Sequence, residues 1–108
     1  MGSVLGNLQM IVITGTVRIP VGSLDKCRPA MRAMVDASRA EQGCLHYSYA
    51  EDVFEPGLIW VSESWSDGAV LKAYAESAHM AAWRAAGAEL GLHDRQLTAY
   101  EAVSAKSL

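Results

Sequence analysis

Two segments of alternating side chains on either side of Pro56-Gly57 constrain the fold of this chain more than any other feature. Pro-Gly is typical of turns, and alternation at every second residue is typical of strands. Residues 44–53 and 58–65 therefore predict an antiparallel hairpin. In the second segment, one face is expected to carry Ile59, Val61, Glu63 and Trp65, and the other Trp60, Ser62 and Ser64. In the first segment, Leu45, Tyr47 and Tyr49 are expected to oppose His46 and Ser48.

The segments before the hairpin predict a strand and then a helix. Residues 10–19 are dense in β-branched side chains and predict a strand. Ser23 is a good N-cap, and the apolar residues after it follow helical spacing. Pro29 conflicts with a regular helix because it lacks an N–H, so either the helix kinks there or its regular part begins near Arg28. Gly43 is expected to end this helix in a left-handed conformation.

The segments after the hairpin predict a helix in two parts and a last strand. Asp67 is an N-cap candidate for a helix that runs to about Glu76. Ser77 is expected to cap a further helical segment, which continues to Gly91. Residues 95–103, RQLTAYEAV, predict the final strand.

The resulting order, β-α-β-β-α-β, predicts a ferredoxin-like α+β fold with two helices on one face of an antiparallel sheet. Residues 10–108 are expected to form this single domain, and residues 1–9 a flexible leader or an expression remnant. The sequence offers no element to cover the second face of the sheet, where Trp60 and Tyr100 would be exposed. Packing of two such faces predicts a homodimer, a dimeric α+β barrel.

The composition excludes several classes of function. The formal net charge is −3 and the charges are mixed in sign, so nothing predicts binding to nucleic acid. No apolar run is long enough to cross a membrane, and the first residues do not resemble a signal peptide. Cys27 and Cys44 are interpreted as reduced, packed thiols. A cytoplasmic location is therefore expected.

Common catalytic motifs are missing from the sequence. It has no glycine-rich phosphate loop, no nucleophile elbow and no pair of Cys or His at the spacing of metal ligands. His46, His79 and His93 fall on different predicted elements. Neither a metal nor another cofactor is expected.

One face of the predicted hairpin is rich in aromatic and ionisable side chains. If the second helical region folds over that face, an aromatic-walled pocket forms between sheet and helices, which suits a flat aromatic ligand. Its expected members are Tyr47, Tyr49, Glu63, Trp65, Tyr74, His79, Trp83 and Arg84.

Each of these residues also has a structural interpretation. Tyr47, Tyr49, Tyr74 and Trp65 could be core aromatics, and His79 and Arg84 could be solvated helix residues. Glu63 is harder to dismiss, because a buried carboxylate costs several kcal/mol unless it is paired; it is expected to be functional or to pair with Arg84. His46 is interpreted as a dimer-interface residue and His93 as a loop residue.

Three motifs resemble the antibiotic-biosynthesis-monooxygenase domain family. The segment from Ser38 to Tyr47, SRAEQGCLHY, is similar to the family's "ASRAEPGCLRY" junction. Glu63-Ser-Trp65 resembles its "ExW" strand end, and LKAYAESAHM, from Leu71 to Met80, resembles "LxAHLxSPHM". The resemblance covers roughly residues 10–103.

This resemblance implies a dimer of ferredoxin-like domains with a pocket in each subunit. Members include quinol monooxygenases and polyketide-tailoring enzymes, which oxidise anthrone-like substrates with molecular oxygen and no flavin, haem or metal. It implies site roles for Trp65, His79, Arg84 and Tyr49. Haem-degrading members carry an axial histidine where this chain has Arg84, which cannot ligate iron.

Two departures limit what the resemblance implies. Val61 stands where the polyketide enzymes have an asparagine, and Leu71 stands where they have a tyrosine. Other relatives are isomerases of small sugar-derived molecules, so the fold does not fix the reaction.

The leading hypothesis is a cofactor-independent monooxygenase that oxidises a small aromatic, anthrone-like or hydroquinone-like substrate. His79 is the first candidate for its base and Glu63 the rival. Trp65, Tyr47, Tyr49, Tyr74 and Trp83 would contact substrate, and Arg84 would stabilise negative charge. The alternatives are an isomerase that uses the same histidine, or a binding or stress module without turnover.

Overall fold

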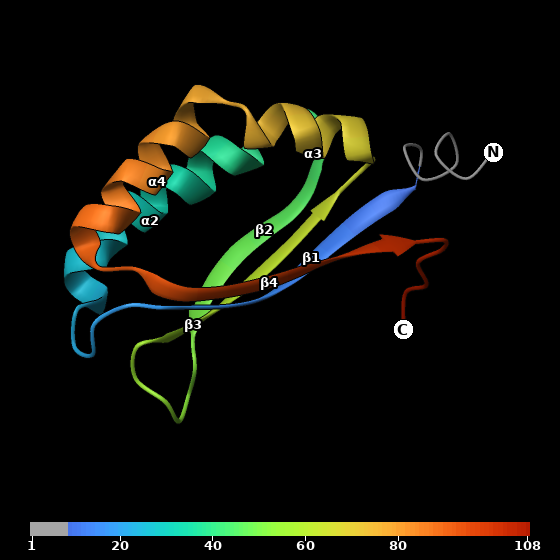
Figure 1. Cartoon of the computed structure of the whole chain (residues 1–108). Helices are drawn as coiled ribbons and strands as arrows, with labels where there is room; N and C mark the ends of the chain where they lie inside the picture. The colour runs from blue at the N-terminus through green and yellow to red at the C-terminus, as the bar shows by residue number, and fades with distance from the viewer. Residues whose placement is uncertain (1–8) are drawn as a thin grey trace.

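A four-stranded antiparallel sheet carries all the helices on one face (Figure 1). The computed structural model describes residues 9–108, so most of the expected leader lies outside the described residues. The elements are β1 (Met10–Arg18), α2 (Leu24–Arg39), β2 (Cys44–Glu51), β3 (Leu58–Trp65), α3 (Gly68–Ala75), α4 (Ala78–Leu90) and β4 (His93–Ala102). The strand order is β2-β3-β1-β4. The ferredoxin-like α+β prediction is confirmed, with the second helical region divided into α3 and α4.

Side-chain caps divide that second helical region where the sequence predicts. The Asp67 carboxylate accepts a hydrogen bond from the Val70 N–H at 3.0 Å, which starts α3. The Ser77 hydroxyl accepts one from the Met80 N–H at 3.3 Å, which starts α4. Gly91 ends α4 in the left-handed region at a φ of 82°. Each cap satisfies backbone groups that a helix end leaves free.

Helix α2 departs from the prediction at its C-terminal end. It ends at Arg39, with Ala40 in a right-handed conformation, so Gly43 is not its cap. Gly43 does adopt a positive φ of 88°, but at the entrance to β2. A Cβ there would collide with the side chains of Ser66 and Val70, so the glycine allows the start of α3 to pack closely. The helix continues through Pro29.

A β-bulge at Leu45 corrects the predicted faces of β2. Cys44 pairs with Trp65 and His46 pairs with Ser64, so Leu45 is an extra residue in the ladder. Leu45 is consequently 57% exposed instead of facing the helices. Beyond the bulge the alternation holds, and Tyr47 pairs with Glu63 on the helix-covered face.

The two faces of the sheet differ as expected. The helix-covered face is buried in two apolar clusters, one around Trp65 and one around Ile59. On the outer face, Trp60 is 46% exposed and Tyr100 is 55% exposed. Neither cysteine forms a disulfide. None of the described helices is long and apolar enough to cross a membrane.

Candidate active site

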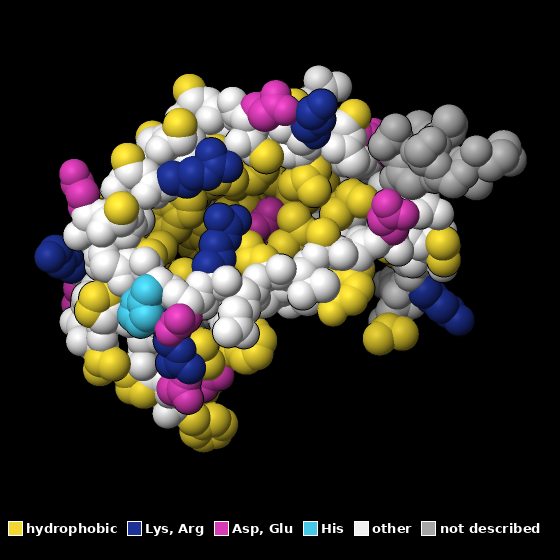
Figure 2. Space-filling model, in the orientation of Figure 1, with side chains coloured by type: hydrophobic (Ala, Val, Ile, Leu, Met, Phe, Trp, Pro, Cys, Tyr) yellow, Lys and Arg dark blue, Asp and Glu magenta, His cyan; other side chains and the backbone are white. Residues whose placement is uncertain are grey.

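A cavity of about 510 Å³ lies between the sheet and the α3–α4 region. Figure 2 shows it as a hollow with mostly apolar walls and basic side chains near its mouth. Of the expected site residues, Tyr47, Tyr49, Glu63, Tyr74, Trp83 and Arg84 line it. Trp65 and His79 do not line it. A volume of this size is typical of small-molecule sites.

Glu63 supplies a buried carboxylate to the cavity. Alternation along β3 turns it toward the helices, where it is only 5% exposed. Its Oε1 accepts a hydrogen bond from the Trp65 indole N–H at 2.9 Å, and its Oε2 has no hydrogen-bond partner among residues 9–108. Burial raises the pKa of Glu63, while the Trp65 N–H and the charge of Arg95 oppose that rise. Glu63 is thus a carboxylate of raised basicity with one oxygen left for a ligand.

Arg84 is not the partner of Glu63 that the sequence suggests. Helix α4 places it at the exposed rim of the cavity, where its Nη2 donates to the Ala75 carbonyl oxygen at 3.3 Å. No salt bridge joins Glu63 to any described residue: its charge is balanced only by the indole N–H and by the more distant Arg95.

Three tyrosine hydroxyls form a chain that ends at the cavity. Ser38 Oγ lies 3.1 Å from the Tyr74 hydroxyl, and that hydroxyl donates to Tyr47 at 3.0 Å. The Tyr47 and Tyr49 hydroxyls are 2.7 Å apart. If Tyr47 donates to Tyr49, the Tyr49 hydrogen is left for a ligand. Burial raises the pKa of all three tyrosines above the ordinary value, so they stay protonated as donors at neutral pH.

Aromatic contacts fix the wall that carries this chain. Tyr49 on β2 stacks against Trp83 on α4, with ring centres 5.8 Å apart and planes at 21°. Tyr47 meets Tyr49 edge to face at 5.4 Å. A wall built from two elements in this way presents a flat apolar surface to a ligand.

Trp65 acts behind the wall instead of forming part of it. Its side chain is 0% exposed, and its ring centre lies 4.3 Å from that of Tyr74. Cys44 on β2 and Val70 on α3 pack against the apolar cluster that contains it. Trp65 affects the cavity indirectly, because its indole N–H donates the hydrogen bond that orients the Glu63 carboxylate.

His79 lies outside the cavity, on the far side of Tyr74. Its ring centre is 5.4 Å from the Tyr74 ring. Its Nε2 is buried without a hydrogen-bond partner among the described residues, and the nearest carboxylate oxygen, Glu41 Oε1, is 3.7 Å away. The first turn of α4 points it toward the loop between α2 and β2. This placement does not support its expected contact with a ligand.

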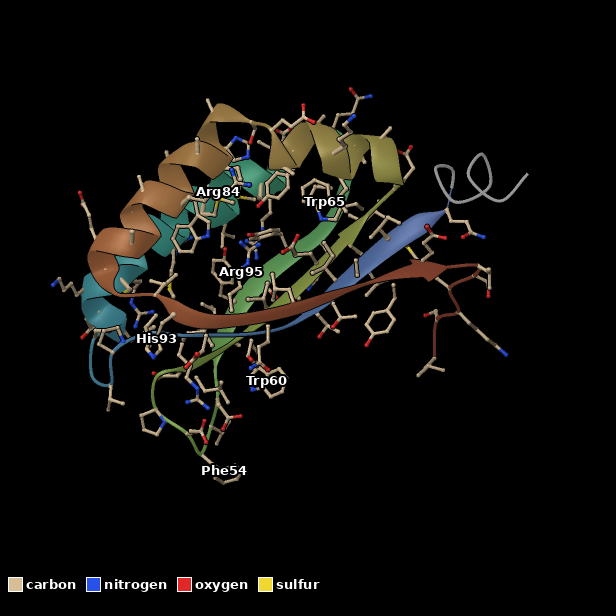
Figure 3. The ribbon with its side chains drawn as sticks, in the orientation of Figure 1. Phe54, Trp60, Trp65, Arg84, His93 and Arg95 are labelled. Atoms are coloured by element: carbon tan, nitrogen blue, oxygen red, sulfur yellow. The ribbon has the colours of Figure 1, made fainter. Side chains whose placement is uncertain are left out.

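Arg95 and His93 line the cavity but were not among the expected site residues. The expected loop residue His93 is the first residue of β4. Leu97 pairs with Gly15 on the helix-covered face, and the pairing of β4 with β1 becomes irregular between Gln96 and His93, where Arg95 lies at the cavity. The predicted strand at residues 95–103 had no assigned faces, so the inward position of Arg95 was missed. Figure 3 shows Arg84 and Arg95 on the two sides of the cavity mouth.

The site is therefore an aromatic cavity with a buried acid at its floor, tyrosine donors in its wall and cations at its mouth. No group of three or more His, Cys, Asp or Glu side chains in residues 9–108 could hold a metal ion. This arrangement is typical of small-molecule sites, and in this ferredoxin-like domain Glu63 is the buried carboxylate that lines the cavity.

The chain belongs to the antibiotic biosynthesis monooxygenase family, whose model matches residues 10–86. A relative from Bacillus subtilis (strain 168), named "Putative monooxygenase YcnE", is 31% identical over 81 residues, which are 75% of this chain and 85% of the relative. This membership supports a monooxygenase-type function.

Solved structures agree with that assignment. A protein described as a "putative antibiotic biosynthesis monooxygenase" from Deinococcus radiodurans matches with a TM-score of 0.82 and 26% identity, over 91% of this chain and 97% of the other. One from Caulobacter crescentus CB15, with the same description, matches with a TM-score of 0.78 over 95% and 98% of the two chains. At 20% identity, that second likeness concerns the fold alone.

Proposed function

We propose that this protein is a cofactor-independent monooxygenase that oxidises a small aromatic substrate of the anthrone or hydroquinone type. The observation that carries the proposal is the buried Glu63 carboxylate, which faces an aromatic cavity with one free oxygen. Membership of the monooxygenase family supports the reaction class. The flat wall of Tyr49 and Trp83 supports an aromatic substrate.

Glu63 is the proposed base. Of the two candidates in the sequence, only Glu63 lines the cavity, whereas His79 lies behind Tyr74. Burial raises the pKa of Glu63 toward the range in which a carboxylate accepts a proton from an activated C–H or phenolic O–H group. The Trp65 N–H fixes the orientation of the carboxylate.

The reaction of an anthrone then needs only substrate and oxygen. Glu63 takes a proton from the activated carbon, and the Tyr49 hydroxyl donates to the oxyanion that develops on the ring. The substrate anion passes one electron to oxygen, and the two radicals combine to form a carbon–oxygen bond. Glu63 returns the first proton to the peroxide. Loss of the second proton from that carbon then breaks the oxygen–oxygen bond, and the departing hydroxide takes up this proton and leaves as water. One oxygen atom remains as the new carbonyl and the other leaves in water.

Arg84, the buried Tyr47 and Tyr74, and the half-buried Trp83 have supporting roles in this proposal. Arg84 at the rim would stabilise negative charge on the substrate. Tyr47 and Tyr74 polarise the Tyr49 hydroxyl through the hydrogen-bond chain. Trp83 holds the substrate ring.

We also propose that the protein is a homodimer and resides in the cytoplasm. The support for the dimer is the outer face of the sheet, where Trp60 and Tyr100 remain exposed although each is a large aromatic residue. The support for the location is the free state of both cysteines.

A product screen tests the oxygenase proposal. Anthrones, hydroquinones and catechols are incubated with the protein under air and under nitrogen, and products are identified by mass spectrometry with oxygen uptake recorded in parallel. We expect a product one oxygen richer and two hydrogens poorer from an anthrone, in air only, before and after dialysis against a strong chelator. Rearranged product under nitrogen would indicate an isomerase, and loss of activity on chelation would refute cofactor independence.

A further inference from the structure

The mouth of the cavity holds two guanidinium groups from different elements. Arg84 lies on α4 and Arg95 on β4, and both line the cavity. Figure 3 shows them facing the opening from opposite sides, and Figure 2 shows basic side chains on both sides of the hollow. Two like charges held at one opening repel each other unless an anion lies between them.

Neither guanidinium has a carboxylate partner within residues 9–108. The arginine salt bridges of that region lie elsewhere, between Arg18 and Glu55 and between Arg28 and Asp25. Among the described residues, Arg84 donates to the backbone carbonyl oxygen of Ala75 and to no carboxylate. Asp94 also lines the cavity, but its side chain is 65% exposed and its Oδ2 lies 3.9 Å from His93 Nε2. The two arginines are thus available to an incoming anion.

The floor of the cavity has the opposite charge preference. Glu63 is buried there with a free oxygen, so a second anion placed beside it would be repelled. A ligand with an acidic group at one end and a neutral ring system at the other fits both ends in one orientation only. That orientation turns the neutral end toward Glu63 and the Tyr49 hydroxyl.

We infer that the substrate is an aromatic acid whose carboxylate binds between Arg84 and Arg95 while its ring lies against Tyr49 and Trp83. This inference rests on the proposed function in taking the cavity as the substrate site. Guanidinium groups recognise carboxylates with two parallel hydrogen bonds, which supplies both affinity and orientation.

Binding of a matched pair of ligands tests the inference without turnover. We would measure the affinities of 2-naphthoate and 2-naphthamide by titration calorimetry, because the two differ mainly in charge. Charge-assisted hydrogen bonds predict that the acid binds about tenfold to a hundredfold more tightly. The preference should shrink between low and high salt, since both arginines are exposed.

Single variants locate the source of that preference. Arg84→Gln and Arg95→Gln should each weaken binding of the acid several-fold and leave the amide unchanged, which also reports that the variants are folded. Arg28→Gln is the matched control, because Arg28 is paired with Asp25 and does not line this cavity. It should leave both affinities unchanged.

Two results would overturn the inference: equal affinity for acid and amide, or a preference for the acid that survives both cavity substitutions together. Failure of the oxygenase proposal is distinguishable from either. A strong preference for the acid without oxygen uptake by any substrate would sustain the acid site and refute the oxidation. Oxygen uptake with neutral substrates and no preference for acids would support the oxygenase proposal and refute the acid site.

Discussion

Replacing Trp65 by phenylalanine tests whether this residue acts through Glu63. Phenylalanine keeps an aromatic ring in the core but removes the indole N–H that Glu63 Oε1 accepts at 2.9 Å. A hydrogen bond to a charged group contributes about 1.5–3 kcal/mol. The smaller ring also leaves a cavity at a fully buried site, at a cost on the order of 1 kcal/mol. We expect the free energy of unfolding to fall by roughly 2.5–4 kcal/mol at pH 7.

The loss should depend on pH because the indole N–H stabilises the ionised form of Glu63. Burial raises the pKa of Glu63 and the Trp65 N–H opposes that rise, so the substitution lets the pKa rise further. A carboxyl with a raised folded-state pKa favours folding below its unfolded pKa, about 4.3, and loses that contribution as pH rises through the folded pKa. Because the folded-state pKa of Glu63 is higher in the variant, the variant loses more of this contribution between pH 4 and pH 7. The difference in free energy of unfolding between wild type and variant should therefore be smaller at pH 4 than at pH 7.

Urea denaturation followed by circular dichroism at the two pH values measures this deficit. Trp83→Phe is the matched control, because the Trp83 indole makes no hydrogen bond to the described residues, and its deficit should not change with pH. Because Trp65 does not line the cavity, Trp65→Phe should keep its affinity for a flat aromatic ligand within a few-fold. An equal deficit at pH 4 and pH 7 would refute the reasoning.

Four further predictions follow from the site and the sheet. Glu63→Gln should lower turnover by about 10²–10⁴-fold in an oxygen electrode while ligand affinity persists, and full activity would exclude Glu63 as the base. Wild-type turnover should rise with pH with a midpoint above the ordinary glutamate value of about 4.3, because burial raises the pKa of Glu63; a midpoint below it would contradict that cause. His79→Ala should keep turnover within a few-fold, and a loss as large as that of Glu63→Gln would return the histidine to the mechanism. Light scattering should give about twice the mass of one chain, with Trp60→Glu shifting the protein toward monomer; a folded wild-type monomer would refute the dimer.

The sequence predicted the starts of α3 and α4 well because each has a local cause. Asp67 and Ser77 are caps whose hydrogen bonds involve neighbouring residues only, so their positions could be recognised without the fold. The faces of β3 follow from alternation, and the helix-covered face is buried as expected. The bulge at Leu45 could not be predicted, since it depends on the pairing of β2 with β3 and on no local pattern.

The sequence predicted most of the residues that line the cavity but not how the other expected residues are placed around it. Alternation placed Tyr47, Tyr49 and Glu63 on the correct face, which is a local property. The depth of Trp65 and the exclusion of His79 depend on how α3 and α4 sit over the sheet, which spacing does not specify. For the same reason the sequence could not show that Arg84 lies at the rim of the cavity and does not pair with Glu63.

The bulge in β2 has a consequence for how copies of this chain can associate. β2 is an edge strand, and an uninterrupted edge offers its free backbone groups to any other strand. Leu45 breaks the regular repeat, and the Arg39 guanidinium already occupies the Tyr47 carbonyl oxygen at 3.0 Å. This stretch is therefore a poor template for the addition of a strand from another copy. Such edge-to-edge addition has no natural end, because each added copy offers a new edge. Contact through the outer face would instead close after two copies, because each buries the same surface against the other.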